Sequence, residues 1–119
     1  MGIHIISSAL SDRGSKYAVS GAQAHDKAEI DKLLKSLKSK KKFAKATHHS
    51  WACLLTNGGL IKQDDGEAGA GMVIARMLER EQLCDHLVIV TRWFGGTKLG
   101  GDRFRRIQDC VRLYLDDIR

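Results

Sequence analysis

Apolar residues alternate with polar ones in some parts of the chain and recur at helical spacing in others. Strand-like patterns cover residues 3–10, 16–19, 50–56 and 87–92, with a short pairing strand expected at 60–61. Stripes with a period of about 3.6 residues cover 26–39, 70–82 and the segment that begins at Asp102. The expected order is therefore strand, strand, helix, strand, helix, strand, helix.

Each expected helix carries a single apolar stripe. In the first helix Asp26 is a suitable N-cap, and Glu29 completes a capping box. The three stripes consist of Ile30, Leu33, Leu34 and Leu37, then Val73, Ile74, Met77 and Leu78, then Phe104, Ile107, Val111, Tyr114, Leu115 and Ile118. Because each stripe packs against one partner, the sequence predicts an α+β fold of two layers, a mixed sheet with helices on one face.

The composition is that of one globular domain with an excess of positive charge. The chain has 119 residues, of which 43% are hydrophobic, and its formal net charge is +6. That charge permits binding to nucleic acid, an acidic protein face or an anionic membrane surface. The three cysteines form no CxxC pair, so we expect a reducing cytoplasm rather than a disulfide framework. Neither a signal peptide nor a membrane-spanning helix is expected.

A glycine-rich connection between a strand and a helix is the most informative stretch. After Thr91-Arg92-Trp93-Phe94 the loop carries four glycines around Lys98, and backbone amides in such loops often point at anions. The loop is not a Walker A motif, because Leu99 follows Lys98 where that motif needs Ser or Thr. Gly69-Ala70-Gly71 lacks the third glycine of a dinucleotide fingerprint.

Three arginines, Arg103, Arg105 and Arg106, crowd the first turn of the last expected helix. Each cation there opposes the helix dipole by a few tenths of a kcal/mol up to about 1 kcal/mol, so an opposite charge should offset them. The offset is either internal, from Asp64, Asp65 and Glu67, or external, from a bound phosphate or a partner's carboxylate. Arg105 is also spaced i,i+4 from Asp109, as in a surface ion pair.

The acidic cluster Asp64-Asp65-Gly66-Glu67 raises two further possibilities. Its carboxylates could bind a metal with His48 and His49, but the rest of a calcium loop is missing. A zinc site would require those histidines to meet Cys53 and Cys84 through folding. Paired carboxylates also suit acid–base catalysis, but no nucleophile accompanies them. We expect no metal, no cofactor and no enzymatic activity.

Lysines are densest between Lys35 and Lys45, and Trp93 and Phe94 precede the glycine loop. The lysines are favoured near a helix C-terminus by the helix dipole and are typical of a solvated helix end. The two aromatic residues fit core packing, stacking on a nucleic-acid base, or a protein hot spot. The sequence leaves these alternatives open.

Three segments, in this order and spacing, resemble the Impact family: Lys45-Ala46-Thr47-His48-His49, Asp64 to Gly71 (DDGEAGAG) and Val90 to Gly100 (VTRWFGGTKLG). The resemblance covers about residues 11–117. The continuation Gly101-Asp102-Arg103-Phe104-Arg105 is similar to the eukaryotic branch. The acidic segment departs from the bacterial form, in which proline usually follows the glutamate.

The resemblance implies the fold of the second domain of ribosomal small-subunit protein five. Eukaryotic members regulate translation during amino-acid starvation by competing for a ribosome-associated activator of the general-control kinase. The yeast member is linked to actin monomers, and a basic groove in bacterial members suggests nucleic-acid binding. We expect one Impact-type domain over residues 1–119, without the RWD domain of eukaryotic members or the C-terminal ferredoxin-like domain of bacterial ones.

The leading hypothesis is a non-enzymatic, cytoplasmic binding domain in general amino-acid control, with a ribosome-associated protein as partner. RNA binding through a basic surface is the alternative. The residues expected to meet a partner or an anion are Arg92, Trp93, Gly95, Gly96, Lys98, Gly100, Arg103 and Arg106. The resemblance adds a motif loop formed by His48, Asp64, Asp65, Gly66, Glu67, Gly69 and Gly71.

Overall fold

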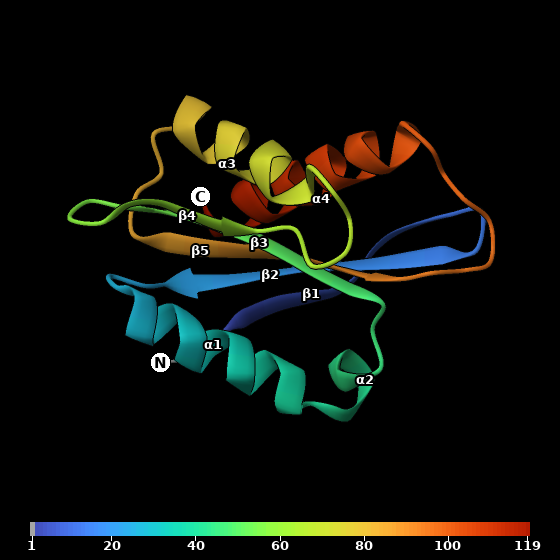
Figure 1. Ribbon diagram of the computed structural model, residues 1–119, viewed down its shortest axis with the longest axis horizontal. Coiled ribbons are helices and arrows are strands. Elements are labelled where there is room, and N and C mark those ends of the chain that lie inside the picture. Colours follow the sequence, from blue (N-terminus) through green and yellow to red (C-terminus); the bar gives the residue numbers. More distant parts are fainter. Residues whose placement is uncertain (1) are drawn as a thin grey trace.

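The computed structural model describes residues 2–119 as a five-stranded sheet with helices on both faces (Figure 1). The strands are β1 (His4–Asp12), β2 (Ser15–Gln23), β3 (His48–Leu55), β4 (Gly59–Gln63) and β5 (His86–Trp93). The helices are α1 (Lys27–Ser39), α2 (Lys41–Ala44), α3 (Ala70–Arg80) and α4 (Asp102–Ile118). The strand order is β1-β2-β5-β3-β4, and every neighbouring pair is antiparallel. The α+β class predicted from the sequence is confirmed.

The central strands bury side chains on both faces of the sheet. In β5, Leu87 and Ile89 belong to the core beneath α1 and α2, whereas Val88 and Val90 belong to the core beneath α3 and α4. Figure 1 shows the two helical layers on opposite sides of the strands. This alternation follows from the period of two along a strand, which sends successive side chains to opposite faces.

The prediction of a mixed sheet with helices on one face is wrong. Short turns join β1 to β2 and β3 to β4, and such turns connect antiparallel strands. The apolar run from Leu87 to Val90 has no polar side, so helices must cover both faces to remove it from water. A single stripe on a helix shows that the helix has one contact face, but it does not specify which face of the sheet receives it.

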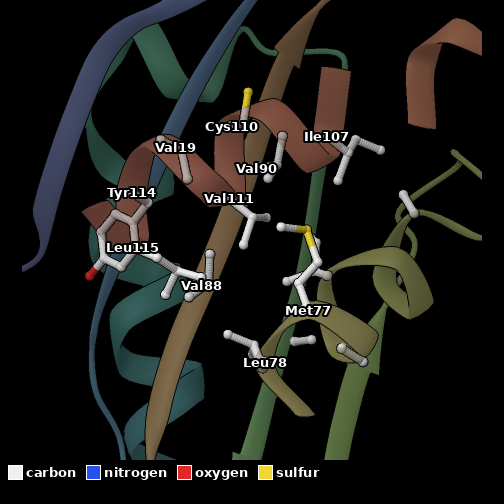
Figure 2. Close-up of a cluster of buried hydrophobic side chains, with 14 of the residues drawn as sticks. Val19, Met77, Leu78, Val88, Val90, Ile107, Cys110, Val111, Tyr114 and Leu115 are labelled. Carbon is white, nitrogen blue, oxygen red and sulfur yellow. The ribbon is translucent and has the colours of Figure 1, made fainter. Parts of the chain in front are cut away.

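The core on the α3–α4 side is shown in Figure 2. Val88 and Val90 of the sheet face Val111 of α4 and Leu78 of α3, and all four are at most 3% exposed. Of the residues expected in the α4 stripe, Ile118 is exposed in the last turn and Phe104 is partly buried. The other four residues expected in that stripe are buried, so the helical period located most of this contact face.

On the opposite face, α1 begins and ends where the sequence predicted. Asp26 accepts a hydrogen bond from the Glu29 N–H at 2.8 Å, and the Glu29 carboxylate accepts one from the His25 N–H at 2.6 Å. The short helix α2 was not predicted. Phe43 anchors it by inserting into the core at 4% exposure, which leaves Lys41 on the outside.

Candidate functional site

Three segments that are distant in the sequence line one cleft of about 500 Å³, called here the motif cleft. The lining residues are Thr47, His48, Gly66, Glu67, Ala68, Arg92, Phe94, Lys98, Leu99, Gly100 and Arg103. Sheet register explains this convergence, because Arg92 of β5 lies opposite Tyr17 of β2 and His48 of β3. All three segments that resemble the Impact family therefore contribute to one site.

A buried ion pair joins two walls of the motif cleft. Glu67 and Arg92 are each 5% exposed, and Arg92 Nη1 lies 2.5 Å from Glu67 Oε1. Arg92 also donates to Ser15 Oγ, at 3.4 Å from Nε and 3.2 Å from Nη2. Arg92 lines the cleft, but its charge is matched inside the protein, so it differs from the surface cation that the sequence suggested. Ser15 gave no sequence signal, because its partner is 77 residues away.

The other two carboxylates of the acidic cluster hold the backbone around them. Asp64 accepts hydrogen bonds from the N–H groups of Gly69, at 3.1 Å, and Gly71, at 2.8 Å. These bonds satisfy amides at the start of α3, where Gly69 is the N-cap with φ 88°. Asp65 accepts from the His49 N–H at 2.7 Å. Of the three carboxylates considered as an internal offset, only Glu67 lies near one of the three helix-start arginines, Arg103, and it also pairs with Arg92.

Replacing Asp64 by Asn should reduce stability at neutral pH. The hydrogen bond from the Gly69 N–H is the main cause that lowers the pKa of Asp64 in the folded protein. The stabilisation is therefore present above the unfolded-state pKa of about 3.9 and is lost as pH falls through the lower, folded-state pKa. Asn keeps one acceptor oxygen but places an NH2 group against the second amide donor, so we expect the free energy of unfolding at pH 7 to fall by about 1 kcal/mol, as for one lost hydrogen bond, in urea titrations.

The same titrations at several pH values supply the control for this prediction. The difference between wild type and Asp64→Asn should shrink below about pH 4. Asp31→Asn, which removes an exposed i,i+4 partner of Lys27, should cost about 0.5 kcal/mol at most. A difference for Asp64→Asn that stays constant from pH 7 into acid would contradict the assigned role.

The remaining cations divide between the cleft and the adjacent surface. Lys98 is exposed and Arg103 is half-buried, and both line the motif cleft. Arg103 Nε lies 3.9 Å from Glu67 Oε1, and its Nη1 donates to the Gly100 carbonyl at 3.0 Å. Arg106 does not line the cleft and pairs with Asp109 at 3.3 Å. The expected Arg105–Asp109 pair is replaced by this one, and Arg105 lies 4.0 Å from Asp102.

Backbone amides around the glycine loop are largely used inside the protein. Phe94 N–H donates to Thr47 Oγ1 at 2.9 Å, and Gly95 N–H donates to Ser15 Oγ at 3.2 Å. At the start of α4, the N–H groups of Asp102 and Arg103 donate to the carbonyls three residues earlier. The positive character of the cleft therefore comes from side chains, chiefly Lys98 and Arg103, more than from these amides.

The histidines and cysteines considered as metal ligands in the sequence do not come together in the fold. His48 Nδ1 is 2.9 Å from the Asp65 carbonyl oxygen, and buried His49 contacts Thr91 Oγ1 and the Phe43 carbonyl. Burial is the main cause that lowers the pKa of His49 and raises that of Cys53 to about 11. Within residues 2–119, no three His, Cys, Asp or Glu side chains are grouped so as to hold a metal ion.

Next to the motif cleft, lysines and aromatic rings form a second concave surface of about 690 Å³. We call it the lysine–aromatic groove, and its lining residues are Gly14, Lys16, Lys41, Lys42, Lys45, Trp93 and Phe94. Phe94 lines both the groove and the motif cleft. The sequence indicated the lysine run and the two aromatic residues separately, but the fold brings them together with Lys16 of β2.

The sequence profile of the Impact N-terminal domain matches residues 13–115. The chain is 36% identical over 115 residues to the Protein IMPACT homolog of Caenorhabditis elegans, covering 91% of this chain and 45% of that protein. It is 33% identical over 107 residues to the homolog of Schizosaccharomyces pombe, covering 87% and 38% respectively. The chain thus spans less than half the length of these relatives.

Solved structures also resemble the protein. One, described as the two-domain translational regulator Yih1, has a TM-score of 0.53 and 30% identity, covering 86% of this chain and 42% of that one. Another, described as a hypothetical protein, has a TM-score of 0.79 at 20% identity, covers 98% of this chain and 61% of that one, and supports the fold. Among residues 2–119, no helix has both the length and the apolar character needed to cross a bilayer.

Proposed function

The chain belongs to the Impact family, and from that premise we propose that it is a non-enzymatic binding domain that regulates translation. A solved relative is described as a translational regulator, which supports this role. We further propose that the domain acts in the cytoplasm, in general amino-acid control, by contacting a ribosome-associated protein. The observation that carries the proposal is the convergence of all three family-like segments on the motif cleft.

The chemistry of the motif cleft favours recognition over catalysis. Glu67 is neutralised by Arg92, Asp64 is bonded to backbone amides and Asp65 holds β3, so these carboxylates serve the fold. Lys98 and Arg103 remain at the rim, beside the apolar surface of Phe94. A cationic rim around an apolar patch fits an acidic segment of a protein partner that also offers an apolar side chain.

Reversing the charge at Lys98 should weaken capture of the partner. In this experiment the purified, tagged protein is incubated with nuclease-treated cell extract, and bound proteins are identified by mass spectrometry. Lys98→Glu places a like charge against an acidic partner, so recovery of ribosome-associated protein should fall roughly tenfold. Because Lys98 is exposed and forms no ion pair within residues 2–119, its replacement should leave thermal stability unchanged.

Lys35→Glu is the matched control for this capture experiment. It makes the same change in net charge on the exposed side of α1, outside the motif cleft. Its recovery of ribosome-associated protein should equal that of the wild type. Equal losses for the two variants would show a general charge effect, and recovery of no ribosome-associated protein by the wild type would overturn the proposal.

A further inference from the structure

The lysines of the lysine–aromatic groove form a patch of positive charge that the protein itself does not neutralise. Lys16 lies in β2, Lys41 and Lys42 lie in α2, and Lys45 follows α2. Within residues 2–119 none of these lysines takes part in an ion pair, whereas Arg92 is matched by a carboxylate. Charge that is unmatched inside the protein remains available to an anionic ligand.

An exposed aromatic ring lies among these cations and is held in place. Phe94 is 46% exposed, although its backbone N–H is bonded to Thr47 and the Arg92 guanidinium lies 5.6 Å from its ring centroid. Leaving so much apolar surface in water costs free energy. A fixed ring that is open to solvent beside lysines is suited to stacking on a flat, electron-rich group.

Trp93 fixes the lysines relative to that ring. Its indole N–H donates to the Lys42 carbonyl at 3.1 Å, and Lys42 Nζ lies 5.2 Å from the indole centroid. Phe43 packs against the same indole with the ring centroids 5.3 Å apart. Trp93 therefore attaches α2 to the end of β5, which places the lysines of α2 along the groove beside Phe94.

The groove adjoins two other concavities, so exposed cations extend beyond it. A concavity of about 370 Å³ shares Lys16, Lys42 and Trp93 with the groove and adds Ser7, Ser8 and Ser11 of β1. Phe94 also lines the motif cleft, to which Lys98 contributes. Cations distributed along a path suit a chain of phosphates better than one isolated anion.

We infer that the lysine–aromatic groove binds single-stranded RNA, with its lysines at the phosphates and Phe94 stacked on a base. Base faces are accessible to an aromatic ring in an unpaired strand but not inside a duplex. Single-stranded RNA would use both features of the groove, because its phosphates meet the lysines and a base face meets the exposed ring. The choice of RNA over DNA rests on the proposed function in translation, whereas the polyanion and the stacked base follow from the groove.

Binding of a labelled oligouridylate of about 12 nucleotides to the full chain tests this inference by fluorescence anisotropy at several salt concentrations. The logarithm of the affinity should fall linearly with the logarithm of salt concentration. Lys41→Gln/Lys45→Gln removes two exposed cations and should make that slope shallower by about 1.4, or about 0.7 for each phosphate contact. Phe94→Ala should weaken binding roughly tenfold with the slope unchanged, and Phe94→Trp should restore it.

Lys32→Gln/Lys35→Gln is the matched control, because it removes the same charge from α1, outside the groove. Its salt slope should equal that of the wild type. The assignment of the groove as the RNA site would be overturned by an unchanged salt slope for Lys41→Gln/Lys45→Gln or by equal changes in slope for the two lysine pairs. Tighter binding of duplex RNA than of the oligouridylate would overturn it as well. An oligothymidylate should respond to the variants in parallel, whereas binding of DNA without RNA would overturn the choice of RNA.

The two proposals fail separately in these experiments. Protein capture is measured after nuclease treatment and depends on Lys98, whereas oligonucleotide binding uses purified components and depends on Lys41 and Lys45. If capture persists while the oligouridylate does not bind, only the proposal of an RNA site fails. If the oligouridylate binds but no ribosome-associated protein is captured, only the proposal of a protein partner fails.

Discussion

Glu67→Gln is expected to reduce the free energy of unfolding by about 3 kcal/mol, because it leaves the Arg92 charge buried without a counter-charge. The Arg92 side chain is 6% exposed and that of Glu67 is 4% exposed, so water cannot compensate the guanidinium. The two Ser15 contacts that remain are made to a neutral hydroxyl, which is a weaker partner than a carboxylate. Urea denaturation followed by circular dichroism measures the change directly.

A double-mutant cycle separates the ion pair from general effects of substitution. Replacing both Glu67 and Arg92 by Met removes the two buried charges together, so the double variant should lose much less than the sum of the single variants. The pair formed by Arg106 and Asp109, whose side chains are 32% and 52% exposed, is the contrast, and Asp109→Asn should cost less than about 1 kcal/mol. Additive losses at Glu67 and Arg92 would contradict the pairing.

Gly95→Ala is the second substitution from which we expect a large loss, about 3 kcal/mol, as for severe overpacking. A Cβ at this position would lie 2.0 Å from the Gly14 carbonyl carbon and 2.4 Å from the Ser15 nitrogen. These are backbone atoms, so no side-chain rotation relieves the clash. The glycine loop must move away from the β1–β2 turn, which also strains the bond from Gly95 N–H to Ser15 Oγ.

Gly101→Ala provides the matched control in the same loop. A Cβ at Gly101 meets no atom within 4 Å, and the φ of this residue is −64°, a conformation that alanine adopts readily. We expect its thermal midpoint to equal or exceed that of the wild type, because alanine reduces the conformational freedom of the unfolded chain. Similar losses for both alanine variants would contradict the close approach of the two turns.

The effect of these substitutions on function follows from shared geometry. Ser15 Oγ accepts from both Arg92 and Gly95, so the ion pair and the glycine loop meet at one hydroxyl. A shift of the loop would therefore displace Lys98 at the rim of the motif cleft. Substitutions at Glu67 and Gly95 should weaken partner capture through loss of shape, whereas Lys98→Glu should weaken it while stability is retained.

Local patterns in the sequence determined much of the secondary structure. The Asp26 cap, the end of α1 at Ser39 and the buried run from Leu87 to Val90 depend on residues within a few positions of one another. Hydrophobic periodicity and helix capping depend on residues within that range, so both can be read directly from the sequence. The three family-like segments were also readable, because each is a continuous run of residues.

Tertiary structure alone decided which face of the sheet each helix covers and which charges neutralise one another. Glu67 and Arg92 are 25 residues apart, and Lys16 of β2 lines the same groove as the lysines of α2. Both outcomes depend on strand order and register, which set Arg92 opposite Tyr17 and His48. A cation in a sequence has no visible partner until folding brings one within a few ångströms, so Arg92 resembled Lys98 in the sequence but forms a buried ion pair with Glu67 in the fold.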